Sequence, residues 1–221
     1  MMKRLFIVAE GQTEQEFINT VLSPYLQCFD IFAVTPILIR TSRIGRGGHV
    51  NAHHLLNTIN GLLRESQDPE LVVTTFIDFF RIPNNMPGYK ESTQERDSEA
   101  QINLLEKALC RKIDNPRFFP YIQRHEFETL LFSANCGFEE YCSEVQSRET
   151  GRIINSYDNP EDINSSPENN PSKRILNIIS DYDKVILGNL IALEIGIDTI
   201  LDRCPRFAAW VQRIIDVCSS P

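Results

Sequence analysis

Five carboxylates stand at or near the ends of expected strands, and together they could hold a metal ion. They are Glu10, Glu14, Asp78, Glu126 and Glu128. The carboxyl ends of parallel strands meet at one edge of a sheet, which is where α/β folds bind ligands. Glu14 follows Glu10 by four residues, so it can face the same crevice from the first turn of a helix. A lone glutamate at a strand end is more often a solvated cap. The prediction of a functional site therefore rests on the group of carboxylates and not on any single one.

Carboxylates crowded together are costly unless a cation lies between them. Hard cations such as Mg²⁺ prefer oxygen ligands, commonly one or two carboxylates together with water and phosphate oxygens. We therefore predict that Mg²⁺ or Mn²⁺ binds here. The reaction expected of such a site is phosphodiester hydrolysis, in which metal-activated water attacks phosphorus. Glu10, Asp78 and a third carboxylate, preferably Glu126, are expected to hold the ion.

Basic side chains and one histidine could complete the site. His125 could act as a general base or a ligand, although a lone histidine is more often structural. Lys173 could offset charge that develops in the transition state, because a cation at a helix start is disfavoured by the helix dipole and so needs a reason. The alternative for Lys173 is a solvated helical turn. Expected contacts to nucleic acid come from Arg40, Arg43, Arg46 and Arg174. The alternative for Arg40, Arg43 and Arg46 is that they belong to an exposed loop with no binding role.

Strands and amphipathic helices alternate through the first part of the chain. Short β-forming runs occur at 3–9, 31–39, 71–77 and 117–123. Pro120 places the last run at an edge or a bulge. After Glu10 and Gly11, Thr13 and Glu16 fit a capping box that opens a helix. Alternation of this kind predicts an α/β fold with a mostly parallel four-stranded sheet flanked by helices.

Composition limits the function classes. The 221 residues carry a formal net charge of −8, so contact with nucleic acid requires a local basic patch. None of the six cysteines forms a CxxC pair, and no apolar run reaches the length of a membrane span. We expect a cytoplasmic protein with an α/β core over 1–135 and a helical C-terminal extension over 136–221.

Several segments resemble known families. Val8 to Glu14 resembles the first motif of Toprim domains, especially in the overcoming-lysogenization-defect (OLD) nucleases. A second resemblance, to the domain of unknown function numbered 4276, rests on the segments 75–80 with 87–89, 120–132, 163–167 with 171–174, and 204–210. It implies a Toprim-like fold, metal-dependent nuclease chemistry, and a partner ATPase of the AAA or ABC type in bacterial defence loci.

The resemblance assigns roles to three residues. Glu10 matches the Toprim glutamate, Glu14 its companion, and Asp78 the first aspartate of the DxD motif. Phe80 stands where the second aspartate belongs. Either one metal ligand is missing, or Glu126 or Glu128 supplies it. A mechanism with two metal ions is therefore in doubt, and a mechanism with one metal ion remains open.

The sequence thus predicts a metal-dependent nuclease acting on DNA or RNA, the effector of an anti-phage defence system controlled by an ATPase. The alternative is a non-catalytic module that binds the ATPase. Another phosphotransfer enzyme is a third reading, and the chain has no P-loop motif. Expected partners are nucleic acid and the ATPase, with a homo-oligomer left open and no membrane contact.

Overall fold

A single parallel sheet organises the chain in the computed structural model, which describes residues 3–39, 51–66, 68–163 and 169–219. Its strands are β1 (Arg4–Ala9), β2 (Ala33–Leu38), β3 (Leu71–Asp78), β4 (Phe118–Phe119) and β5 (Ile122–Gln123). The order is β2-β1-β3-β4, with β5 also paired to β3, and every pair is parallel. The expected parallel sheet is confirmed.

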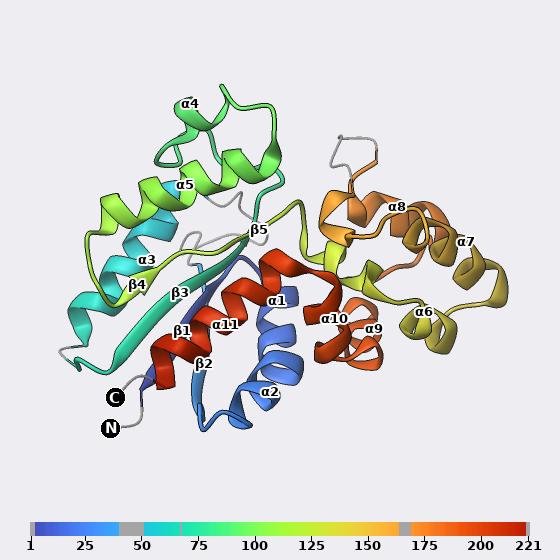
Figure 1. Cartoon of the computed structure of the whole chain (residues 1–221), viewed down its shortest axis with the longest axis horizontal. Coiled ribbons are helices and arrows are strands. Elements are labelled where there is room, and N and C mark those ends of the chain that lie inside the picture. The colour runs from blue at the N-terminus through green and yellow to red at the C-terminus, as the bar shows by residue number, and fades with distance from the viewer. Residues whose placement is uncertain (1–2, 40–50, 67, 164–168, 220–221) are drawn as a thin grey trace.

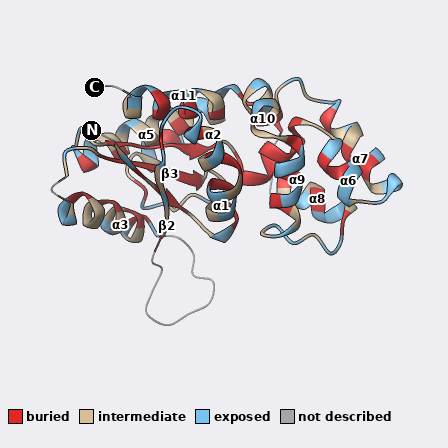
Figure 2. Ribbon diagram, turned by 90° about the horizontal axis from the view of Figure 1, so that it is seen from below, coloured by how far each residue is buried: buried red, intermediate tan, exposed pale blue. Residues whose placement is uncertain are grey.

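Side chains alternate between two hydrophobic clusters, one on each face of the sheet. On β1, Leu5 and Ile7 join one cluster, whereas Val8 joins the other. The first face is covered by α1 (Gln12–Phe17), the π-helical turn η1 (Ile18–Leu22), α2 (Ser23–Gln27) and α11 (Pro205–Ser219). The second is covered by α3 (Ala52–Glu65) and α5 (Ser98–Ile113), with the short α4 (Tyr89–Ser92) packed on α5 (Figures 1 and 2). The core strands are therefore buried on both sides, as in other parallel sheets.

The fourth expected strand is split in two at Pro120. Thr75 bridges the gap, because its Oγ1 donates to the Tyr121 carbonyl at 2.7 Å and accepts from the Tyr121 amide at 2.8 Å. The Thr75 side chain thus replaces the backbone hydrogen bonds that are lost where the strand is interrupted at Pro120. Both halves lie at the edge of the sheet, as the proline predicted.

Beyond the sheet the chain is helical, as expected. The elements are η2 (Phe127–Ser133), α6 (Cys136–Tyr141), α7 (Glu144–Ile154), η3 (Pro160–Asp162), α8 (Pro171–Ile178), α9 (Leu187–Ile195) and α10 (Ile197–Arg203). One hydrophobic cluster includes residues from both sides of position 135, and α11 returns across the sheet (Figure 1). The division at 135 stays a prediction. Within the described residues, no helix has the length and apolar character needed to cross a membrane.

Candidate active site

Glu10 and Asp78 meet at the carboxyl ends of the neighbouring strands β1 and β3. The Asp78 amide donates to Glu10 Oε2 at 3.0 Å, and the Glu10 amide donates to the Phe76 carbonyl at 3.2 Å. The parallel register that pairs Ala9 with Phe76 fixes this arrangement. The expected meeting of carboxylates at one edge of the sheet is therefore present.

Glu14 joins them from the first turn of α1. The Gly11 amide donates to Glu14 Oε2 at 2.7 Å, and the carboxylate is almost fully buried. The expected capping box was wrong by two residues: the helix is capped at Gly11 and Glu14, Thr13 is buried inside the helix, and Glu16 is exposed. A Cβ on Gly11 would lie 3.3 Å from Glu14 Oε2, so the glycine lets the carboxylate lie close against the turn.

Two carboxylate oxygens in this region are buried without a hydrogen-bond partner among the described residues. They are Asp78 Oδ1 and Glu128 Oε1. Asp78 is partly exposed as a residue, but this oxygen is not. An unpaired buried acceptor costs on the order of 1–3 kcal/mol, and more when it is charged. Groups of this kind in native proteins call for a missing partner, such as an ion or a water molecule.

Burial and mutual repulsion raise the pKa values of the site's acids. Burial raises the pKa of Glu10 to about 7, with a further contribution from Glu14. Burial also raises the pKa of Glu128 to about 7, helped by Glu126. The pKa values of Glu14 and Asp78 are raised as well, by burial first and, for Asp78, then by Glu14 and Glu10. The four acids therefore share one electrostatic environment, in which a cation would favour their ionised forms.

Glu126 lies near these acids but is already engaged. Its Oε2 accepts from the Ser172 amide at 2.9 Å, and its Oε1 accepts from Ser172 Oγ and from Asn170 Nδ2, each at 3.1 Å. It thereby caps the N-terminus of α8, where a carboxylate complements the free amides. Of the two glutamates in the segment, Glu128 is the one with an unpaired oxygen.

His125 faces away from the carboxylates. Its φ is +68°, and its carbonyl accepts from the Phe80 amide at 2.8 Å. Burial lowers its pKa to about 4, and the other groups that influence it are Arg124, the Glu161 backbone and Asp162. The ring thus lies toward η3. No carboxylate of the site is among the groups that influence its pKa, so the geometry does not favour the predicted catalytic role of His125.

Lys184 is an exposed lysine whose charge acts on the carboxylates of the site, and it was not among the residues predicted from the sequence. Burial lowers its pKa, but Glu14, Glu128, Asp78 and Glu10, in that order, outweigh this and raise the pKa above its usual value. The side chain lies just before α9, whose Asn189 Nδ2 donates to the Thr13 carbonyl at 3.2 Å and ties α9 to α1. No local spacing marks Lys184, because only the tertiary packing of α9 on α1 brings it to the site.

The other predicted basic residues are placed differently. Lys173 is exposed on α8, and no carboxylate of the site is among the groups that its charge influences. Arg174 Nε donates to the Asn169 carbonyl at 2.7 Å, and its guanidinium lies 5.9 Å from the centre of the Tyr157 ring. Neither contact involves a carboxylate of the site. Arg40, Arg43 and Arg46 lie outside the described residues.

The donor set suits a cation that needs few protein ligands. Within the described chain, no group of three or more His, Cys, Asp or Glu side chains is arranged to hold a metal ion. Mg²⁺ commonly uses only one or two carboxylates, with water and phosphate oxygens completing its shell. Asp78 Oδ1 and Glu128 Oε1 are available oxygens of that type. The residues therefore fit a site completed by solvent and substrate.

Comparison with known proteins identifies the family. Residues 9–215 match the family described as a domain of unknown function (DUF4276), and the chain belongs to this family. No curated protein matches the chain. The family predicted from the motifs is thus confirmed over nearly the whole sequence.

Solved structures agree on the fold. The C-terminal region of the OLD protein of Xanthomonas campestris pv. campestris has a TM-score of 0.50 and 12% identity, covering 98% of this chain and 92% of that one. The C-terminal region of the Burkholderia pseudomallei OLD protein has a TM-score of 0.50 and 14% identity, covering 97% and 100%. At such identities the likeness shows the fold, and the expected Toprim-like, OLD-related architecture is confirmed.

Proposed function

We propose that this protein is a metal-dependent nuclease that hydrolyses phosphodiester bonds in DNA or RNA. The observation that carries the proposal is the acidic cluster of Glu10, Glu14, Asp78 and Glu128, in which Glu14 and Glu128 are buried and two carboxylate oxygens lack a partner among the described residues. The kinship with the C-terminal regions of OLD proteins supports a nuclease-related family.

Each residue has a distinct part in the proposed reaction. Asp78 and Glu128 would hold Mg²⁺ or Mn²⁺ through their unpaired oxygens, with Glu10 and Glu14 close by. The ion, when bound, would supply positive charge to a phosphodiester and lower the pKa of water. Lys184 would bind a substrate phosphate and offset its negative charge. Lys184 replaces Lys173, and Glu128 replaces Glu126, in the roles that the sequence analysis gave them.

The missing second aspartate does not remove the site. Phe80 stands at that position, and its amide is used by the His125 carbonyl. Glu128 supplies a carboxylate from η2 instead. Although it is distant from Asp78 in the sequence, its negative charge contributes to the raised pKa of Asp78. This arrangement favours one tightly bound ion, and a one-metal mechanism is the form of the proposal that we prefer.

A cleavage assay tests the proposal. Wild type should cut supercoiled DNA, single-stranded DNA or tRNA when Mg²⁺ or Mn²⁺ is present and should be inactive in EDTA. Glu128→Gln keeps the shape of the side chain and should lose this activity, whereas Glu126→Gln should retain most of it. Equal activity of wild type and Glu128→Gln would contradict the assignment.

A second function, a module that binds a partner protein, is favoured by α9. Ile186, just before the helix, and Leu190 and Leu193 within it recur at helical spacing, and their exposed fractions are 65%, 37% and 46%. Exposed apolar rows of this kind commonly mark protein interfaces. The AAA- or ABC-type ATPase partner, control by that ATPase and a role in anti-phage defence stay predictions. Co-purification with an ATPase in the native host, lost in Leu190→Glu, would support them.

A further inference from the structure

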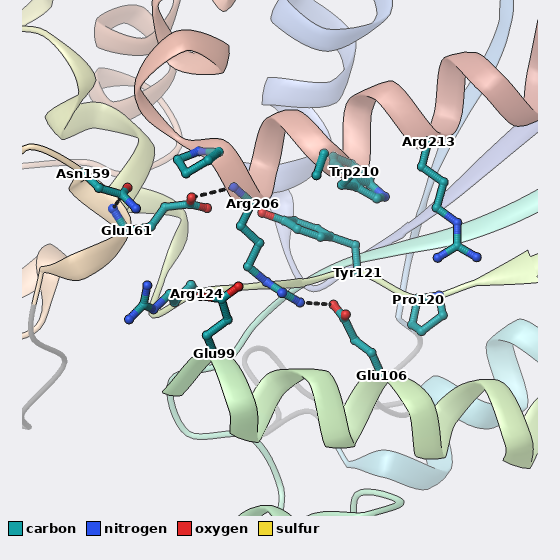
Figure 3. Close-up of a pocket in the computed structure, with 12 residues that line it drawn as sticks. Glu99, Glu106, Pro120, Tyr121, Arg124, Asn159, Glu161, Arg206, Trp210 and Arg213 are labelled. Carbon is teal, nitrogen blue, oxygen red and sulfur yellow. Dashed lines mark hydrogen bonds and ion pairs between the residues drawn. The ribbon is translucent and has the colours of Figure 1, made fainter. Parts of the chain in front are cut away.

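A groove runs along the sheet edge between α5 and α11, away from the acidic cluster. It contains a hollow of about 350 Å³ and an adjoining one of about 330 Å³, which share Glu106, Pro120 and Arg213 as lining residues. Figure 3 shows the first hollow, with α5 on one side, α11 on the other, and Tyr121 between them. The two hollows therefore form one continuous groove.

The buried acids of the groove are already compensated. Glu106 pairs with Arg206 Nη2 at 2.6 Å and accepts from the Ile122 amide at 2.8 Å (Figure 3). Glu161 caps α11 by accepting from the Arg206 amide at 2.8 Å and the Phe207 amide at 3.2 Å. Glu161 uses both of its carboxylate oxygens in these bonds, whereas both contacts of Glu106 are made by its Oε1. The buried acids thus do not set the charge that a ligand would meet.

The rim of the groove is basic. Five basic and three acidic side chains line the two hollows: Lys107, Arg111, Arg124, Arg206 and Arg213 against Glu99, Glu106 and Glu161. Lys107, Arg111 and Arg213 are exposed, and Glu99 is the exposed acid facing them. Arg213 is held over the Phe119 ring, with its guanidinium carbon 4.5 Å from the ring centre. Arg124 is paired with Asp162 and Asp97, and Arg206 is paired with Glu106. The positive charge that the groove offers to a ligand therefore comes from the exposed Lys107, Arg111 and Arg213.

The sheet edge itself is closed to a peptide strand. Pro120 has no amide hydrogen to offer, and the Ile122 amide is used by Glu106. The Ile122 carbonyl accepts from Arg206 Nε at 3.5 Å. Addition of a strand needs free donors and acceptors along the edge, so backbone pairing with a peptide is disfavoured here.

We propose that the groove between α5 and α11 binds the phosphate backbone of a nucleic-acid strand. The proposal rests on the proposed nuclease function and gives it a binding surface for the substrate. Arg124, which lines the groove, directly precedes His125 and Glu126 in the chain. Sequence-independent affinity for nucleic acid comes mainly from basic contacts to phosphates. The groove would supply the local basic patch that the acidic composition requires.

Binding without cleavage tests the groove directly. Fluorescence anisotropy with short single-stranded DNA and RNA would be measured in EDTA, so that no reaction occurs. Arg111→Glu should weaken binding about fivefold, and Lys107→Glu/Arg111→Glu more, with the salt slope reduced by about 0.7 per lost phosphate contact. Lys112→Glu is the matched control, because it is the next residue on α5, exposed, and outside the groove lining. It should bind within about twofold of wild type.

The outcomes separate this inference from the proposed function. Equal losses in Arg111→Glu and Lys112→Glu, or no binding by wild type at low salt, would overturn the groove proposal. If binding behaves as expected but wild type never cleaves with Mg²⁺ or Mn²⁺, the groove stands and the nuclease proposal fails. If wild type cleaves and the groove variants bind and cleave as wild type does, the nuclease proposal stands and the groove proposal fails. Melting curves of the variants confirm that each is folded.

Discussion

Buried carboxylates occur in this molecule in two different settings. Around α8 and α11, Glu126 and Glu161 are each tied by hydrogen bonds to the first amides of a helix. The other setting comprises Asp78 at the end of β3 and Glu128 on η2, each of which has a buried oxygen without a partner among the described residues. Burial is common to both settings, and the difference lies in what satisfies the charge.

The contrast separates structural from functional acids. A carboxylate that caps a helix gains hydrogen bonds and a favourable dipole, so its burial is compensated by the protein itself. A cluster of unpaired acids stays costly until something from outside compensates it. Removing a capping acid should therefore cost stability, whereas removing a cluster acid should cost function.

The largest expected effect is on activity. Asp78→Asn should reduce metal-dependent cleavage by more than about 100-fold. Loss of a residue that only supports a metal ligand costs up to about 100-fold, and loss of a ligand itself should cost more. The variant should be at least as stable as wild type without metal, because it removes one of several repelling charges. Cleavage rates and thermal melting in EDTA check both statements. A variant that is inactive because it is unfolded would contradict the contrast.

Glu161→Ala should do the opposite. It leaves the amides of Arg206 and Phe207 without their acceptor at the start of α11, and the loss should be about 2 kcal/mol of unfolding free energy. Denaturant unfolding measures it, and Glu161→Gln, which keeps one acceptor oxygen, should lose less. Cleavage by folded Glu161→Ala should stay close to that of wild type, and a strong loss would place Glu161 among the functional acids.

The two candidate lysines sharpen the comparison further. Lys184→Met should lower cleavage about tenfold, because it removes a cation that acts on all four cluster acids. Lys173→Met, which removes an exposed cation from α8, serves as the control and should change the rate little. Steady-state kinetics on both variants decides between them. A larger loss in Lys173→Met would restore the assignment made from sequence.

The smallest effect expected is on the pH dependence of stability. Glu10 and Glu128 have pKa values near 7 in the folded protein, so the folded state holds more protons than the unfolded state around neutral pH. The contribution of these two acids to stability in EDTA should therefore fall as the pH rises from 4.5, their ordinary pKa, through about 7. His125, whose pKa is lowered from 6.5 to about 4, acts in the opposite direction over part of this window.

Thermal melting at the two ends of this window measures the effect. Glu128→Gln removes one of the two titrating acids and should flatten the dependence. Melting temperatures that rise with pH in the wild type would show that the acids are not protonated as the structure indicates.

Local patterns predicted the parts of the fold that depend on local sequence. The strand ending at Glu10, the break at Pro120 and the helical C-terminal part all follow from periodicity and from the chemistry of proline. Asp78 could also be placed, because the parallel order of β1 and β3 brings strand ends together. The fold and the five candidate acids were thus within reach of the sequence, although the preference for Glu126 over Glu128 was not the arrangement that the structure shows.

Tertiary contacts decided the rest. Glu126 and Glu128 are two residues apart, and nothing in the sequence shows that α8 would engage the first and leave the second unpaired. Lys184 reaches the site through packing of α9 on α1, which involves segments remote in the sequence. The first turn of α1 was placed wrongly because Thr13 has the right type for a cap but is buried by its neighbours.

The most direct test of the account is calorimetric titration of the metal-free protein with Mn²⁺ near neutral pH. Binding should be accompanied by proton release, because a cation favours the ionised forms of acids whose pKa values are near 7. Titrations in buffers of different ionisation enthalpy count the protons, and Asp78→Asn should abolish binding while Glu126→Gln retains it. Absence of binding by wild type at millimolar Mn²⁺ would contradict the metal-dependent site and favour the partner-binding module.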